Sequence, residues 1–239
     1  MTVRNLLALA SDNRGKGTGL RAQAEGDDWT ALYVYDVIDS WWGVSAAAFA
    51  QALNAITTPN IALRINSPGG DVFEARAMMT ALKDHPANIV AKIDGLAASA
   101  ATALTLACDS VEIADGGFYM IHQAWTFAMG NADELTATAG LLNKIDDVLV
   151  DGYVGKSGKS ADDVRALMKA ETWFNAQEAI DAGFADSLMA TTSKSADARA
   201  FNLAAFANAP KALTAPPEPD AAASRERFMS RLGLYERTA

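Results

Sequence analysis

One serine and one histidine stand out in this sequence because of where they lie. Ser99 sits among small residues in the segment 95–100 (Gly-Leu-Ala-Ala-Ser-Ala), at the predicted junction of a strand and a helix. His122 ends an apolar segment, Phe-Tyr-Met-Ile-His, that predicts a strand. A hydroxyl at a helix N-terminus and an imidazole that accepts its proton are the components of nucleophilic acyl transfer. The other histidine, His85, precedes Pro86 in a predicted turn and is the weaker candidate for a base.

A diglycine, Gly69-Gly70, follows the predicted strand 60–66 and lies about one βαβ unit before Ser99. Glycine accepts backbone conformations that other residues avoid, and the preceding Pro68 has no N–H and stiffens the approach. We therefore expect the N–H of Gly70 to be free to face an oxyanion, the negatively charged oxygen of an acyl-transfer intermediate.

An acid that orients the imidazole would complete a catalytic triad. Glu171 begins an apolar segment, Glu-Thr-Trp-Phe-Asn, in which a carboxylate without a partner is unfavourable. Asp186, in Phe-Ala-Asp-Ser, is the alternative. The residues alone leave both open, because either acid can also serve as a surface or capping residue.

Strands and helices alternate along the sequence, which predicts βαβ units, an α/β fold and a mainly parallel sheet. Neighbouring parallel strands end at one edge, where such folds bind ligands, so the diglycine and Ser99 are expected to meet there. The predicted strands are 32–38, 60–66, 88–93, 111–114, 118–122 and 184–188. The predicted helices are 45–56, 72–85, 99–108, 131–153 and 176–182, with further capping signals at Asn131 and Ser160.

The composition divides the chain into three parts. Residues 1–29 are polar and Gly-rich and predict a flexible arm. Residues 30–189 hold the alternating elements and every candidate site residue. Residues 190–239 are rich in Ala and Pro and mildly basic, which predicts a separable tail. Its end, residues 221–235, is typical of a short amphipathic helix that tethers a partner.

The overall composition limits the class of protein. The 239 residues carry a formal net charge of −9, which argues against a nucleic-acid binder. The apolar segments are too short for a membrane span or a signal peptide, so a cytoplasmic protein without membrane contact is expected. The single cysteine, Cys108, is expected to be a buried apolar residue. Neither a metal site nor a cofactor is expected.

Four segments, in this order, resemble the proteolytic subunit of Clp protease (ClpP) between about residues 32 and 188. They are the diglycine, Gly-Leu-Ala-Ala-Ser, Met-Ile-His-Gln and Glu-Thr-Trp-Phe-Asn-Ala-Gln-Glu-Ala. The sequence is most similar to the ClpP-related head maturation (prohead) proteases of tailed phages and prophages, through segments 35–43 and 130–135. The resemblance implies a ClpP/crotonase-type fold of repeated βαβ units, with the helix from Asn131 as a protruding handle.

The resemblance also implies roles for individual residues. Ser99 would be the nucleophile of a serine endopeptidase and His122 its general base. The N–H groups of Gly70 and Ala100 would bind the oxyanion. The acid falls on Glu171, where the housekeeping enzyme has Asp. The side chain here is one methylene longer, so Asp186 is kept as the alternative.

The same resemblance implies a homo-oligomer, a ring, that cleaves polypeptides. For a phage enzyme the substrates would be capsid or scaffold proteins, within the bacterial cytoplasm or the prohead, and use of an ATPase partner is left open. The alternatives are a general ClpP-like housekeeping peptidase and a catalytically weak capsid-assembly protein of the same fold. Signal peptide peptidases use a lysine base, and crotonase-type enzymes need a basic pocket for the CoA phosphates. His122 argues against the first, and the acidic composition argues against the second.

Overall fold

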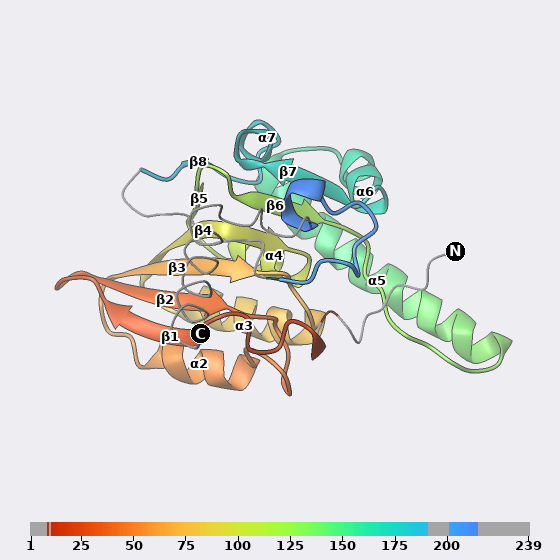
Figure 1. Cartoon of the computed structure of the whole chain (residues 1–239), viewed down its shortest axis with the longest axis horizontal. Helices are drawn as coiled ribbons and strands as arrows, with labels where there is room; N and C mark the ends of the chain where they lie inside the picture. Colours follow the sequence, from red (N-terminus) through yellow and green to blue (C-terminus); the bar gives the residue numbers. More distant parts are fainter. Residues whose placement is uncertain (1–8, 10, 191–200, 215–239) are drawn as a thin grey trace, which may run out of the picture.

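The structure, a computed structural model, describes residue 9, residues 11–190 and residues 201–214. These residues form an eight-stranded sheet with helices packed against it (Figure 1). Six strands follow in the order β1-β2-β3-β4-β5-β8, while β6 pairs with β4 and β7 pairs with β6. The strands are β1 (Gly19–Ala24), β2 (Trp29–Tyr35), β3 (Asn60–Ser67), β4 (Asn88–Ala98), β5 (Ser110–Ile113), β6 (Phe118–Ile121), β7 (Thr172–Asn175) and β8 (Ser187–Leu188).

Most strand pairs in the sheet are parallel, as the alternation of strands and helices predicts. The pairs β2–β3, β3–β4, β4–β5, β4–β6 and β5–β8 are parallel, and β1 and β7 are antiparallel to their neighbours. The prediction of an α/β fold with a mainly parallel sheet is therefore confirmed.

The long strand β4 changes partners along its length. Residues 90–93 pair with β5, and residues 96–98 pair with β6. β6 therefore continues alongside β4 where β5 has ended. This arrangement places the ends of β4 and β6 side by side, immediately before Ser99 and His122.

The helices are α2 (Ala46–Asn54), α3 (Val72–Asp84), α4 (Ala100–Thr105), α5 (Ala132–Ser157), α6 (Ala161–Lys169), α7 (Ala176–Asp181) and α8 (Lys211–Thr214). Helices α2 to α7 form one core on one face of the sheet, whereas α8 belongs to the C-terminal segment on the other face. Leu63 and Ile65 of β3 pack in this core with Phe49 of α2, Met78 of α3 and Leu104 of α4. Burial of such side chains stabilises the fold by about 1.5–3 kcal/mol each. In the described residues, no helix is long and apolar enough to cross a membrane.

Helix α5 begins at the predicted cap. Asn131 accepts a hydrogen bond from the N–H of Glu134, whose side chain accepts one from the N–H of Asn131. The first turns of α5 are exposed and project from the body of the molecule (Figure 1). The second predicted cap, Ser160, likewise accepts from the N–H of Asp163 at the start of α6.

The N-terminal segment differs from the predicted flexible arm. Residues 19–24 form β1, which pairs with β2 along its whole length. The side chain of Asn13 is fully buried. No apolar alternation marks this strand in the sequence, because β1 is an edge strand whose last four residues are exposed.

The C-terminal region also differs from the prediction of a separable tail. Residues 201–214 pack on the second face of the sheet, over an apolar patch made by Leu96, Ala98 and Met120. The tail supplies Phe201, Leu203, Phe206 and Leu213 to this cluster. Covering the patch removes apolar surface from water, which is the physical reason for the contact. The helix predicted over 221–235 lies outside the described residues.

Candidate active site

Ser99 stands at a strained turn between β4 and α4. Its φ of 55° and ψ of −127° are rare for a residue with a side chain and cost about 1–3 kcal/mol. The turn is held by the N–H of Ser99, which donates to Met120 O at 2.9 Å, and by Thr102, whose N–H and hydroxyl donate to Ser99 O at 2.9 and 2.6 Å. The Ser99 hydroxyl makes no capping bond to α4. It is therefore available for another partner.

That partner is His122. Its Nε2 lies 2.7 Å from Ser99 Oγ, within hydrogen-bond distance. His122 follows β6 directly and is 6% exposed, so its ring is largely shielded from water. The structure thus brings together the two residues singled out in the sequence, in the geometry that proton transfer from a nucleophile to a base requires.

The diglycine lies against the Ser99 turn. A Cβ on Gly69 would lie 2.5 Å from Ala98 O, 2.8 Å from Ser99 Cβ and 2.9 Å from Ala100 N. The φ angles of Gly69 and Gly70, 88° and 143°, lie in the region that favours glycine. Any larger residue at position 69 would therefore push the two turns apart.

The orientation of the Gly70 amide follows from its neighbours. Ile38 donates its N–H to Gly69 O and accepts from Asp71 N–H, both at 2.8 Å. In such a bridge the residue between them directs its own N–H and C=O away from the bridging strand. The amide of Gly70 therefore faces away from Ile38. Ala100 is the first residue of α4, whose first amides have no acceptor within the helix.

Glu171 precedes β7 directly, and His122 follows β6 directly. The last pair of the antiparallel β6–β7 ladder is Ile121 with Thr172, so His122 and Glu171 are the next residues beyond that end of the ladder. Glu171 is 4% exposed and has a φ of 51°. A carboxyl group is seldom buried in this way without partners. Here Oε1 accepts a hydrogen bond from the N–H of Asn208 at 2.6 Å.

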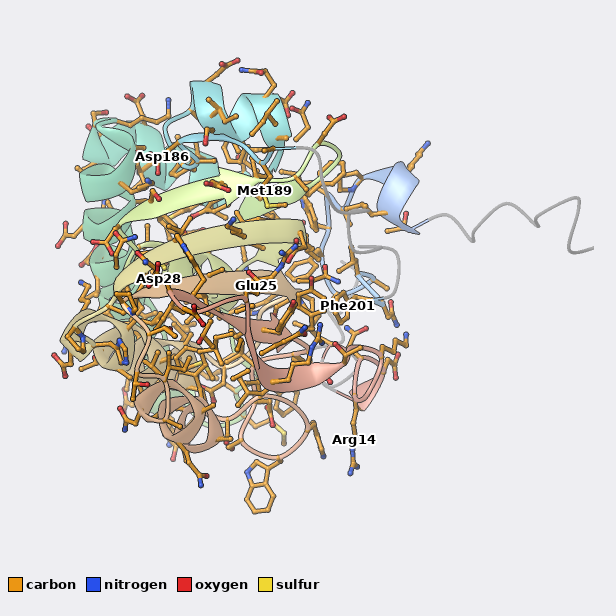
Figure 2. All side chains as sticks on the ribbon, turned by 90° about the vertical axis from the view of Figure 1, so that its left-hand side faces the viewer. Arg14, Glu25, Asp28, Asp186, Met189 and Phe201 are labelled. Atoms are coloured by element: carbon orange, nitrogen blue, oxygen red, sulfur yellow. The ribbon has the colours of Figure 1, made fainter. Side chains whose placement is uncertain are left out.

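Asp186 and His85 are not brought to Ser99. Asp186 accepts from Val111 N–H at 2.7 Å and pairs with Lys156 at 2.7 Å. Val111 pairs with Ala91 of β4, seven residues before the end of that strand. Figure 2 shows Asp186 well separated from Phe201, at which the C-terminal segment over the site begins. His85 ends α3, where its Nδ1 accepts from Ala87 N–H at 3.2 Å.

A buried acid that the sequence analysis did not single out supports the segment after His122. Asp146 of α5 accepts from Ala124 N–H at 2.7 Å and from the Gln123 side-chain amide at 3.3 Å. Burial raises its pKa, although these two bonds lower it in part. Asp146 lies three residues before Leu149, on the apolar stripe of α5. An acid at such a position was the sequence feature that could have identified it as a buried residue.

Ser99 and His122 open into a cleft of about 710 Å³. One wall comes from the diglycine side and includes Val72 and Phe73, and the other comes from residues 124–129 and α5. The charged residues among its described lining are Asp39 and Asp71, and neither lysine nor arginine is among them. Both acids accept hydrogen bonds from nearby backbone N–H groups. The cleft therefore suits an apolar ligand.

The described residues include no group of three or more His, Cys, Asp or Glu side chains arranged to hold a metal ion. Cys108, which is half-buried in a helix-end turn, donates its thiol to Leu104 O at 3.4 Å. Its pKa is raised to about 12 by burial, so this thiol is not a competing nucleophile.

Comparisons with known proteins found a matching family model and similar sequences. A family model described as Clp protease matches residues 44–192. The ATP-dependent Clp protease proteolytic subunit 1 of Leifsonia xyli subsp. xyli is 32% identical over 129 residues, 53% of this chain and 66% of that protein. A proteolytic subunit from Streptococcus pneumoniae is 28% identical over 141 residues, 57% of this chain and 72% of that protein.

A solved structure extends the comparison to the fold. A mutant of ClpP1 from Listeria monocytogenes superposes with a TM-score of 0.59 at 19% identity. The superposition covers 66% of this chain and 90% of that one. The likeness concerns the arrangement of strands and helices.

Proposed function

Because the chain belongs to the Clp protease family, a family of serine-type peptidases, we propose that it is an endopeptidase with Ser99 as nucleophile, His122 as general base and Glu171 as the orienting acid. The observation that carries the proposal is the 2.7 Å contact between Ser99 Oγ and His122 Nε2 at a strained strand-to-helix turn. Strain of this kind is kept where it exposes a reacting group.

The chemistry follows from these positions. His122 Nε2 takes the Ser99 proton while Oγ attacks the peptide carbonyl, and the new oxyanion accepts hydrogen bonds from the N–H groups of Gly70 and Ala100. The imidazolium then gives its proton to the leaving amine, which breaks the C–N bond and leaves an acyl ester on Ser99. Water, deprotonated by His122, hydrolyses the ester. Glu171 stabilises the imidazolium in both halves of the reaction.

The cleft favours a polypeptide over the other substrates considered. An acyl-CoA would bring phosphates, which bind lysine, arginine or free backbone amides, and the described lining offers neither cation. A lysine base would need a lysine near Ser99 Oγ, where His122 lies. Exposed Phe127 and Met129, with 74% and 82% exposure, offer apolar contacts to substrate side chains.

The proposal is tested by incubation of the purified chain with β-casein, an unstructured protein. We expect internal peptides, identified by mass spectrometry, with new termini on both sides of each cut. Hydrolysis of a short acyl-CoA without casein cleavage would contradict an endopeptidase and favour a crotonase-type reaction. Ser99→Ala protein supplies the background for casein cleavage, and a sample without protein supplies the background for acyl-CoA hydrolysis.

We further propose that the protein matures phage heads by cutting capsid or scaffold protein, which would place it in the bacterial cytoplasm or the prohead. The support is the resemblance of segments 35–43 and 130–135 to head maturation proteases. The names of the curated relatives support a second candidate, a general proteolytic subunit of an ATP-dependent protease.

The casein assay separates the two roles when it is repeated on folded substrates. Cutting of a capsid or scaffold protein encoded beside this chain, without ATP, supports the first. Cleavage that requires an added Clp ATPase supports the second.

We also propose that the chain forms a homo-oligomer, a ring, through α5. Leu141 and Val148 on this helix are 50% and 43% exposed, and Leu135 is 44% exposed. Leu141 and Val148 are seven residues apart and so lie on one face of α5, and exposed apolar side chains on a shared helix face are typical of an interface. The neighbouring part of α5 lines the cleft, so assembly and the shape of the cleft are linked.

Val148→Glu is expected to dissociate the oligomer and to lower peptidase activity at least about tenfold, because a buried unpaired carboxylate in an interface is strongly unfavourable. Thr80→Glu, at an exposed position of α3, is the matched control and should leave the native mass and the activity unchanged. The native mass is measured by light scattering at micromolar concentration. A wild-type monomer that is fully active would contradict the proposed assembly.

A further inference from the structure

The C-terminal strap, defined as residues 201–214, lies against the candidate site although it is outside the matched family region, residues 44–192. In Figure 1 it runs beside β6 and β7, at the blue end of the described chain. None of its residues lines the cleft that Ser99 opens into. The strap therefore contacts the candidate catalytic residues from behind without closing the path of a substrate.

The first contact is with the ring of His122. Phe206 packs edge-on against it, with ring centroids 5.6 Å apart and an interplanar angle of 77°. Trp125 meets the same ring at 5.0 Å and 77°, and stacks on Phe206 at 5.6 Å. Trp173 of β7 supports Phe206 from another side, at 5.6 Å. This aromatic group fixes the plane in which the imidazole can lie.

The second contact is with the acid. The N–H of Asn208 donates to Glu171 Oε1 at 2.6 Å, and the Asn208 side chain donates to Ala170 O at 2.7 Å. A hydrogen bond from a backbone amide to a buried carboxylate is short and strong, and it fixes the direction of the carboxylate. Since Glu171 is 4% exposed, water contributes little to the orientation of its carboxylate.

The strap is held at its other end by the N-terminal segment. The side-chain amide of Asn13, fully buried, donates to Asn202 O and to Leu9 O, both at 2.9 Å. Its Oδ1 accepts from Asn202 N–H at 2.5 Å. Asp12 accepts from the Asn202 side chain at 2.9 Å. The N-terminal segment, far from the strap in the sequence, thus anchors the start of the strap.

We propose that Phe206 and the backbone amide of Asn208 are positioning residues, which hold the His122 ring and the Glu171 carboxylate in their reactive orientation. The inference rests on the proposed function of Ser99, His122 and Glu171. It assigns to the strap a part in catalysis in place of the separable role that the sequence suggested. A displacement of about 1 Å in a catalytic group lowers rates on the order of 100-fold.

The acid contact is tested with a matched pair of variants at one position. Asn208→Pro removes the N–H that binds Glu171, whereas Asn208→Ala keeps it and removes only the side-chain bond to Ala170. We expect Asn208→Pro to lower kcat for peptide hydrolysis about 10- to 100-fold with KM within about twofold, and Asn208→Ala to change kcat less than about threefold. In a Glu171→Gln background, Asn208→Pro should add less than about threefold, because the two changes act on one contact. Equal losses in both Asn208 variants, or a full further loss in the Glu171→Gln background, would overturn the inference.

The contact between Phe206 and the His122 ring is tested with a separate variant. The inference can therefore still be tested if the Asn208→Pro protein fails to fold. Phe206→Leu opens the cover over His122 to water, which stabilises the protonated imidazole. The half-maximal point of the kcat–pH profile should therefore move to higher pH by about half a unit or more. Phe49→Leu, an equal truncation of a fully buried phenylalanine in the main core, should lower the unfolding temperature and leave the profile unmoved. An unmoved profile in Phe206→Leu would overturn the role of Phe206. Retained activity in Ser99→Ala would instead refute the proposed function itself.

Discussion

Ser99→Ala is expected to lower kcat/KM for peptide hydrolysis by at least about 10³-fold, because the acyl ester cannot form without Oγ. The fold should be retained. The hydroxyl takes no part in capping α4, and the neighbouring residues 97, 98, 100 and 101 are already alanines. The change in unfolding free energy should be within about 1 kcal/mol. Steady-state kinetics with a fluorogenic peptide and a thermal unfolding scan measure the two effects.

Ser187→Ala is the matched control, since it also deletes a serine hydroxyl, here from an exposed strand residue. It should leave kcat/KM unchanged. Residual activity of Ser99→Ala above about a tenth of wild type would remove Ser99 from the mechanism.

Glu171→Gln is expected to lower kcat about 10²- to 10⁴-fold with little change in KM. The amide oxygen of the new side chain can keep the hydrogen bond to Asn208 N–H. Its NH₂ group would then stand where the second carboxylate oxygen was, and an NH₂ group cannot stabilise the imidazolium of His122. The loss should appear in kcat because the imidazolium forms only as the reaction proceeds.

Asp186→Asn is the comparison that decides between the two candidate acids. Asp186 pairs with Lys156 and accepts from Val111 N–H, so its replacement should lower the unfolding temperature and leave kcat within about twofold. A large loss of kcat in Asp186→Asn, with normal kinetics in Glu171→Gln, would transfer the role of acid to Asp186.

Local sequence signals were sufficient to single out Ser99 and His122, which the structure brings within hydrogen-bond distance. Ser99 was conspicuous because alanines and a glycine surround it, and His122 because it ends an apolar strand. Parallel strands end at a common edge, so the alternation of elements was enough to predict that Gly70 and Ser99 would meet. The caps at Asn131 and Ser160 were also predicted, since each depends on residues only three positions away.

The structural parts that the sequence did not predict depend on distant partners. β1 is an exposed edge strand, so no apolar alternation marked it. The strap has the composition of a tail, and its apolar residues are buried only because Leu96 and Met120 leave a patch on the second face of the sheet. The positions of Glu171 and Asp186 relative to His122 depend on strand pairing, such as the β6–β7 register, which joins residues about fifty positions apart.

If Ser99 and His122 act as one catalytic unit, a double-variant cycle will show it. The kcat/KM for peptide hydrolysis is measured in Ser99→Ala, His122→Ala and the variant that carries both changes. We expect kcat/KM of the double variant to fall no more than about threefold below that of the more damaging single variant, because either change disables the same step. Losses that multiply, or a His122→Ala protein with near wild-type kcat/KM, would contradict their action as one unit.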